Sequence, residues 1–212
     1  MAQVMAQADL IFYYAPQSRS LAVNLLLDEL GAPYERRVLI LTKNEQRQPA
    51  YLAINPMGKV PAIVHKGAVI TEQSAIFIYL PDAFPQKGLA PAIGDPLRGP
   101  YLRWIVFYAA CLEPAVADKA AQHTPMNPRS LGYGDYDTVI KTVEDQLAPG
   151  PYLLGDRFTA ADILWGTALN WLTKFKMVPE TPVIAGYVKR MEDRLQIQKR
   201  RAEDAELVAS QH

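Results

Sequence analysis

Short blocks of apolar and polar residues predict strands and helices in the first third of the chain. Residues 9–14 form an apolar and aromatic run that is typical of a buried strand. Residues 15–17 interrupt this run, and the apolar periodicity of residues 21–30 then predicts a helix that ends at Gly31. A second strand is expected within residues 34–41, so the chain opens with a parallel strand–helix–strand unit.

The pattern continues with a hairpin and a further helix. The polar stretch at residues 42–53 has room for a short helix. Residues 61–64 and 68–70 predict two short strands whose tight connection makes them antiparallel. A helix is expected from residue 72 to about 80, and Pro81 is expected to end it.

A change in composition marks the boundary between two domains. Residues 81–100 are rich in proline and glycine, which is the composition of a linker. We therefore expect an α/β domain at residues 1–83 and an all-helical domain at residues 84–212. The second domain shows helical patterns throughout, at residues 101–121, 136–147, 159–175 and 182–195, with a last piece that ends near Leu207.

Composition and charge exclude several classes of protein. The 212 residues carry 22 Lys and Arg against 22 Asp and Glu, a balance that indicates no nucleic-acid or anionic-membrane surface. The apolar runs are too short for a membrane span and the N-terminus has no signal-peptide pattern, so we expect a cytoplasmic protein. A single cysteine, Cys111, excludes an intrachain disulfide. Three scattered histidines argue against a metal site, and His65 and His123 are expected to face solvent.

The first segment with a chemical signal is Asn55–Ile63, which contains Val60–Pro61. A proline that opens a strand after a tight turn is a plausible site for a cis peptide bond. A cis bond would leave the N–H and C=O of Val60 facing outward, where a bound peptide can pair with them as an added strand. The alternative is a loop that enters an edge strand and has no ligand.

The second and third segments each lie at the predicted start of a helix. At residues 71–76, main-chain amides suit a carboxylate and the side chain of Glu72 suits an ammonium group, as in a zwitterionic amino-acid end. At residues 13–20, a hydroxyl lies beside a helix N-terminus, where a thiolate would be stabilised. Lowering a thiol pKa by two units takes roughly 2.7 kcal/mol, which one charge-assisted hydrogen bond and one helix end can supply. The alternative in both places is ordinary capping, with Ser18 or Ser20 as the N-cap.

The order of these three segments resembles the cytosolic glutathione transferase superfamily over nearly the whole chain. Val60–Pro61 matches the cis-proline motif of that family, and Glu72–Gln73 falls where the family carries an acid or glutamine followed by serine. In the second half, Thr159 and Asp162 match the family's N-capping box at the start of a core helix. The resemblance implies a thioredoxin-like α/β domain followed by an all-α domain.

The resemblance also implies a glutathione site. Val60 and Pro61 would hold the cysteinyl part of glutathione, Glu72 and Gln73 the γ-glutamyl part, and Lys59 would lie nearby. Gln73 departs from the usual serine, although its amide can still donate a hydrogen bond to a carboxylate.

Two candidates remain for the residue that activates the thiol of glutathione. Serine-type members of the family place a hydroxyl in the strand–helix turn, which corresponds to Ser18. Tyrosine-type members use a phenol of the first strand, which corresponds to Tyr13. In that alignment Arg19 matches an arginine that binds the γ-glutamyl carboxylate, and Tyr14 faces the other side of the strand. Cysteine-type chemistry needs a thiol about where Arg19 stands, so it is not expected here.

The predicted function is conjugation of the glutathione thiolate to a small hydrophobic electrophile, as in detoxification. Trp104, Phe107, Tyr108 and Cys111 recur at helical spacing, which is typical of a core but leaves Tyr108 and Cys111 as candidates for the electrophile pocket. The resemblance implies a homodimer with glutathione as co-substrate, and no metal or nucleotide is implied. Three other functions remain open: a non-catalytic carrier of glutathione or apolar ligands, a glutathione-dependent isomerase, dehalogenase or peroxidase, and a partner-binding or regulatory protein, for which no acidic tail or patch speaks.

Overall fold

The computed structural model describes residues 9–123 and 127–210, and their contacts divide the chain into two units. The first unit contains the described residues up to Leu80 together with those from Ile197 onward, and the second is Pro81–Gln196. The division after residue 80 lies near the expected one, but the last helix belongs to the first unit and not to the helical one. Within the described residues, no helix is long and apolar enough to cross a membrane.

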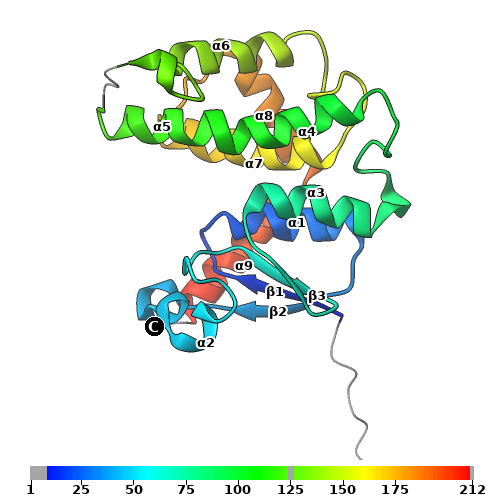
Figure 1. The fold of residues 1–212 in the computed structure, drawn as a ribbon, viewed down its shortest axis with the longest axis vertical. Helices are drawn as coiled ribbons and strands as arrows, with labels where there is room; N and C mark the ends of the chain where they lie inside the picture. The colour runs from blue at the N-terminus through cyan, green and yellow to red at the C-terminus, as the bar shows by residue number, and fades with distance from the viewer. Residues whose placement is uncertain (1–8, 124–126, 211–212) are drawn as a thin grey trace, which may run out of the picture. The chain divides into compact units, whose positions relative to one another are not determined.

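The first unit is built on a four-stranded sheet (Figure 1). Its strands are β1 (Leu10–Tyr14), β2 (Glu35–Val38), β3 (Ala62–His65) and β4 (Ala68–Ile70), in the order β2-β1-β3-β4. β1 is parallel to β2 and β3 is antiparallel to β4, as the sequence predicts, and the structure adds that β1 is antiparallel to β3. All five residues of β1 are buried, because this strand has neighbours on both sides.

Three longer helices and one short helix surround this sheet. They are α1 (Ser20–Leu30), α2 (Pro49–Leu52), α3 (Gln73–Ala83) and α9 (Ile197–Ala209). In Figure 1, α1 and α3 lie on one side of the sheet and α2 lies toward the other. α9 contacts α1 and buries Ile197 and Asp204, which explains why this helix groups with the first unit.

Two local expectations in this unit are wrong. α3 passes through Pro81 and ends at Ala83, since a proline in the last turn removes only one N–H donor and the Pro81 ring is buried there. His65 does not face solvent: only 6% of its surface is exposed, and its Nδ1 lies 2.9 Å from the Tyr79 hydroxyl. His123, by contrast, is exposed as expected.

The described part of the second unit is helical, as predicted. Its α-helices are α4 (Arg98–Phe107), α5 (Glu113–Ala120), α6 (Tyr136–Leu147), α7 (Ala160–Lys174) and α8 (Pro182–Arg194). The single helix expected over residues 101–121 contains a π-helical turn at Tyr108–Leu112. Pro114 follows this turn, and because proline has no N–H and its ring crowds the preceding turn, it favours such a local widening.

The predicted capping box is present at the start of α7. One carboxylate oxygen of Asp162 accepts hydrogen bonds from the main-chain N–H of Thr159 at 2.9 Å and from its hydroxyl at 3.1 Å. The other accepts from the N–H of Leu153 at 2.8 Å and from the Tyr187 hydroxyl at 3.0 Å. Asp162 therefore joins α7, α8 and the loop before α7.

Candidate functional site

The register of the sheet brings two of the predicted segments to the same place. In the antiparallel β1–β3 pair, Tyr13 is opposite Ala62. Ala15 comes two residues after Tyr13, and Val60 comes two residues before Ala62. Because the two strands are antiparallel, Ala15 and Val60 lie at the same end of the sheet. The Val60–Pro61 peptide bond is cis, as the sequence predicts.

The loop before Val60 is held by its own hydrogen bonds. The C=O of Lys59 accepts from the Tyr51 hydroxyl at 2.6 Å and from Asn55 Nδ2 at 2.8 Å. Gly58 has a φ of 59°, and a Cβ there would lie 2.8 Å from the C=O of Gln46, so no other residue fits without a shift.

Val60 itself offers an open main-chain edge. The residue is half-buried, and no described residue hydrogen bonds to its N–H or C=O. Both groups are therefore available to a ligand that pairs as an added strand. Lys59 is exposed beside them.

The start of α3 reaches the β1–α1 turn. Gln73 Nε2 donates a hydrogen bond to the C=O of Arg19 at 3.2 Å, which joins the second and third predicted segments. Glu72 is exposed and has a φ of 62°, a left-handed conformation that is uncommon for a residue with a Cβ. The Gln73 amide thus contacts the turn at Arg19, and Glu72 is its neighbour in the chain.

The turn between β1 and α1 carries a pair of serines. Ser18 Oγ lies 2.7 Å from the C=O of Ala15 and 2.9 Å from Ser20 Oγ, and it accepts from the N–H of Ser20 at 3.1 Å. The N-cap of α1 is Arg19, and the expectation that one of the serines occupies it is wrong. Ser18, one residue earlier, instead accepts from the first helical N–H. Ser20 is fully buried, while Ser18 is half-buried.

Tyr13 and Tyr14 face opposite sides of β1, as expected. The Tyr13 ring packs against Tyr51 with 5.3 Å between centroids, and its hydroxyl accepts from Arg37 Nη1 at 3.4 Å. Tyr14 is 1% exposed, with the Arg36 guanidinium 5.2 Å from the centre of its ring. Burial raises the pKa of the Tyr14 phenol far above its usual value, so this hydroxyl stays protonated.

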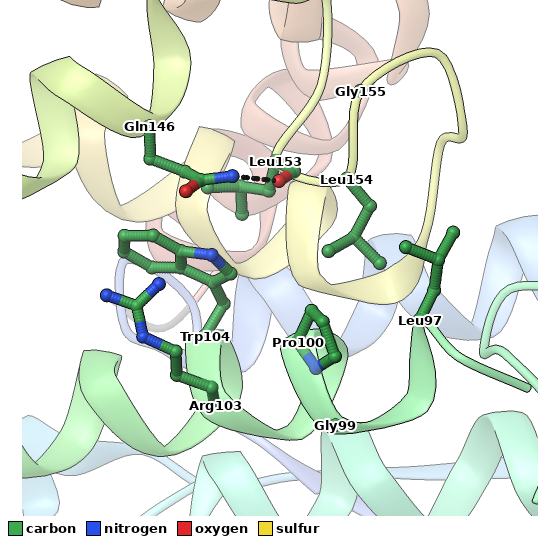
Figure 2. Close-up of a pocket in the computed structure, with 9 residues that line it drawn as sticks. All are labelled: Leu97, Gly99, Pro100, Arg103, Trp104, Gln146, Leu153, Leu154 and Gly155. Carbon is green, nitrogen blue, oxygen red and sulfur yellow. Dashed lines mark hydrogen bonds between the residues drawn. The ribbon is translucent and has the colours of Figure 1, made fainter.

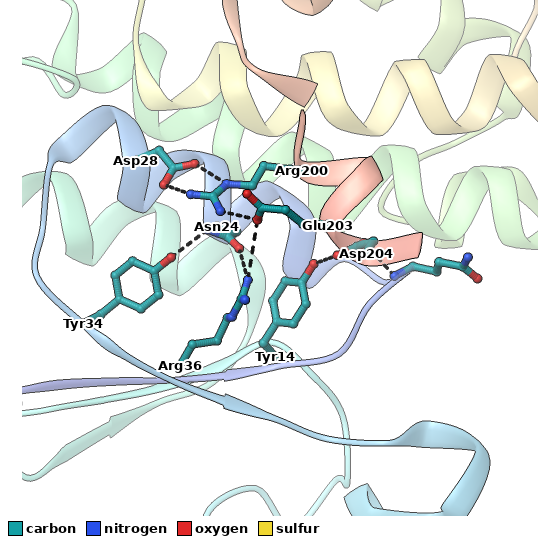
Figure 3. Close-up of polar contacts among 9 residues, drawn as sticks. Tyr14, Asn24, Asp28, Tyr34, Arg36, Arg200, Glu203 and Asp204 are labelled. Carbon is teal, nitrogen blue, oxygen red and sulfur yellow. Dashed lines mark hydrogen bonds and ion pairs between the residues drawn. The ribbon is translucent and has the colours of Figure 1, made fainter. Parts of the chain in front are cut away.

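Asp204 of α9 contacts the β1–α1 turn although it is not among the residues that the sequence predicts for the site. Its carboxylate accepts hydrogen bonds from the Tyr14 hydroxyl and, at 2.9 Å, from the main-chain N–H of Gln17 in the β1–α1 turn (Figure 3). Nothing near residue 204 in the sequence indicates this role, because its partners lie 190 and 187 positions away.

Tyr108 and Cys111 lie in the second unit. Tyr108 is buried, its hydroxyl donates to Glu113, and its ring packs edge-on against Trp165 at 6.0 Å. Cys111 is half-buried with its Sγ 3.8 Å from the C=O of Gly132, and burial raises the pKa of its thiol. Tyr108 is therefore part of the aromatic core of this unit, the simpler of its two expected roles.

A separate pocket of about 580 Å³ lies in the second unit (Figure 2). Neither Tyr108 nor Cys111 lines it. Two of its lining residues contact each other: the Arg103 guanidinium lies 4.4 Å from the centre of the Trp104 ring. The lining residues, mostly apolar, are Leu97, Gly99, Pro100, Arg103, Trp104, Gln146, Leu153, Leu154 and Gly155.

Two family models match the chain. Residues 8–82 match the N-terminal domain of glutathione S-transferases, and residues 129–190 match the C-terminal domain of the same family. The first range covers the sheet, α1, α2 and all but the last residue of α3, and the second covers α6, α7 and most of α8.

Individual proteins give the same result. The chain is 28% identical over 189 residues to the glutathione S-transferase GstA of Escherichia coli O157:H7, covering 88% of this chain and 94% of that protein. It is 31% identical to glutathione S-transferase F10 of Arabidopsis thaliana, covering 71% and 75%. A glutathione transferase homologue from Sulfitobacter, solved with bound glutathione, is 27% identical with a TM-score of 0.71, covering 92% of this chain and 97% of that one.

Proposed function

This chain belongs to the glutathione S-transferase family of enzymes, and from that premise we propose that it conjugates the glutathione thiolate to a small hydrophobic electrophile. One observation carries the proposal: the Val60–Pro61 segment, the start of α3 and the β1–α1 turn lie together in the first unit. They supply a main-chain edge, a carboxylate with an amide, and hydroxyls, which are the groups that a tripeptide thiol requires.

We propose that glutathione lies along the open edge at Val60. Its cysteinyl N–H and C=O pair with the main chain of Val60 beside Pro61, as an added strand does. Its γ-glutamyl end lies at the start of α3, where the Glu72 carboxylate receives the ammonium group and Gln73 and Arg19 receive the carboxylate. Lys59 adds a positive charge beside the tripeptide.

Ser18 is our candidate for the group that activates the thiol. Its oxygen accepts a hydrogen bond from the N–H of Ser20 and lies 2.9 Å from the Ser20 hydroxyl. If the Ser20 hydroxyl donates to Ser18, the Ser18 proton can turn from the C=O of Ala15 toward a thiolate without leaving the Ser18 oxygen short of partners. The start of α1 adds the favourable end of the helix dipole.

Tyr13 is the alternative donor. Its hydroxyl accepts from Arg37 of β2, while its ring lies in a cluster with Tyr51 and Ala62 against which Val60 packs. The phenol proton of Tyr13 is therefore available to a ligand, and we place Ser18 first because it lies at the start of α1, where the helix dipole favours a thiolate. In either case the thiol proton leaves to solvent, the sulfur forms a bond to the electrophilic carbon, and the displaced group departs.

The electrophile would be received by the helical unit. Of the two residues expected there, Cys111 is half-buried and accessible, whereas Tyr108 is enclosed by the core. We also propose that the enzyme acts as a homodimer in detoxification, on the basis of the family.

The test is an ultraviolet titration of the thiolate of bound glutathione in the wild-type protein and in Ser18→Ala and Tyr13→Phe. We expect a thiol pKa well below that of free glutathione, which Ser18→Ala raises toward the free value and Tyr13→Phe leaves unchanged. The reverse pattern would identify a tyrosine-type enzyme. Glutathione that binds with an unshifted thiol would indicate a carrier, and absence of binding would refute the proposal.

A substrate panel then tests the reaction. Consumption of glutathione that matches product formation is expected for conjugation. Turnover without net consumption would instead indicate an isomerase.

A further inference from the structure

The C-terminal helix α9 contacts the β1–α1 turn through one buried carboxylate. Asp204 is only 4% exposed. One of its oxygens accepts from the Gln17 N–H at 2.9 Å and the other accepts from the Tyr14 hydroxyl. Figure 3 shows the side chains of Tyr14 and Asp204 pointing toward each other. A buried carboxylate needs such partners, because an unpaired one is strongly destabilising.

The turn needs a partner of this kind. Gln17 has a φ of 54°, a left-handed conformation that is disfavoured for a residue with a Cβ. Ser18 follows directly, so the orientation of Gln17 decides the direction in which Ser18 leaves the turn. The main chain then continues to Arg19, whose C=O accepts from Gln73. A shift at Gln17 would therefore reach both the serine hydroxyl and the start of α3.

Asp204 is itself held from both sides. Arg200, one helical turn earlier on α9, donates from Nε to Asp28 of α1 at 2.7 Å and also contacts Glu203 (Figure 3). Tyr14, the last residue of β1, is covered by the Arg36 guanidinium. The carboxylate is thus fixed relative to both β1 and α1, the two elements that the turn connects.

We propose that Asp204 is a positioning residue for the thiol-activating turn, holding the Gln17 N–H so that Ser18 points at the sulfur of glutathione. This inference rests on the proposed function, because it concerns the same site. The charge is not essential to the role, whereas the two hydrogen bonds are.

Two substitutions at residue 204 separate these properties. Asp204→Ala leaves Gln17 and Tyr14 without their acceptor, and kcat/KM is expected to fall about ten- to a hundredfold as Ser18 moves. The thiol pKa of bound glutathione should rise toward its free value. Asp204→Asn keeps the size of the side chain: its oxygen accepts from Gln17, and its amide N–H donates to the Tyr14 oxygen. This variant is expected to stay within about threefold of wild type in kcat/KM, with a nearly unchanged thiol pKa.

Asp162→Asn is the matched control, since it alters a buried, hydrogen-bonded carboxylate of the second unit without touching the turn or α9. It should lower the melting temperature and leave the thiol pKa unchanged. If Asp204→Ala behaves in the same way, Asp204 only stabilises the fold and the inference is wrong.

Tyr14→Phe covers the case in which Asp204→Ala does not fold. It removes one of the two hydrogen bonds to Asp204, so the thiol pKa should rise in the same direction by a smaller amount. An unchanged pKa in this variant would overturn the inference. An unshifted thiol in the wild-type protein would instead overturn the proposed function, and the inference with it.

Discussion

Asp162 in the helical unit and Asp204 in the first unit are both buried carboxylates that accept hydrogen bonds from the main chain and from a tyrosine hydroxyl. Asp162 accepts from the N–H groups of Thr159 and Leu153 and from the Tyr187 hydroxyl. Asp204 accepts from one main-chain N–H and from the Tyr14 hydroxyl. The partners of Asp162 lie 3, 9 and 25 positions away, whereas those of Asp204 lie 187 and 190 positions away.

This difference in separation gives the two residues different roles. Asp162 closes a local motif, so its hydrogen bonds stabilise the start of α7 and its packing against α8. Asp204 connects the end of the chain to the turn that carries Ser18, so its hydrogen bonds decide the geometry of the proposed site. Removing Asp162 should therefore act mainly on stability, and removing Asp204 mainly on activity.

The largest expected loss of stability follows Asp162→Ala. Four donors around the site would lose a buried acceptor, and the free energy of unfolding should fall by about 3 kcal/mol or more. Burial raises the pKa of the Asp162 carboxyl, while its hydrogen bonds oppose that rise. Urea denaturation followed by circular dichroism measures the loss. Asp156→Ala, at an exposed aspartate of the same loop, should change stability by less than about 0.5 kcal/mol. Equal effects of the two substitutions would contradict the role of Asp162.

A methyl group added between α7 and α8 tests how much of this stability comes from packing. A Cβ on Gly166 would lie 2.4 Å from Cγ of Met191, so Gly166→Ala should destabilise the protein by about 2 kcal/mol. Gly186→Ala in α8 meets nothing within 4 Å and should stabilise it by up to about 1 kcal/mol. Thermal denaturation of both variants gives the comparison. A neutral Gly166→Ala would mean that the contact with Met191 relaxes without cost.

Asp204→Ala should lower the free energy of unfolding by about 1–2 kcal/mol, which is less than the loss expected for Asp162→Ala. The reason is that Gln17 is exposed, so water can replace the carboxylate at its N–H. In a double-mutant cycle with Tyr14→Phe, the double variant should lose less stability than the sum of the two single losses, because both substitutions remove the same hydrogen bond. Strict additivity would show that Tyr14 and Asp204 do not interact.

The smallest expected effect concerns His65. Burial lowers the pKa of its imidazole, so below the usual value of about 6.5 the unfolded chain takes up a proton that the folded one does not. Stability should therefore fall as the pH drops through about 6.5, by less than about 1 kcal/mol. In His65→Gln, the urea midpoint of unfolding should depend less on pH in this range than it does in the wild-type protein. A wild-type curve that is already flat in that range would contradict the prediction.

The sequence predicted the features that depend on nearby residues. The capping box at Thr159 and Asp162 was readable because both partners lie within one helical turn. The cis bond at Val60–Pro61 was readable because proline alone tolerates that isomer well. Strand β1 was predicted because it is apolar along its whole length.

Tertiary structure alone decided how these pieces combine. The end of α3 beyond Pro81, the burial of His65 and the grouping of α9 with the first unit depend on contacts between distant segments. The role of Asp204 depends on such contacts too, because the residues around an aspartate in a polar helix do not indicate which main-chain N–H will donate to it. Local motifs are encoded by spacing along the chain, whereas a hydrogen bond across 187 positions exists only once the strands and helices between them have packed.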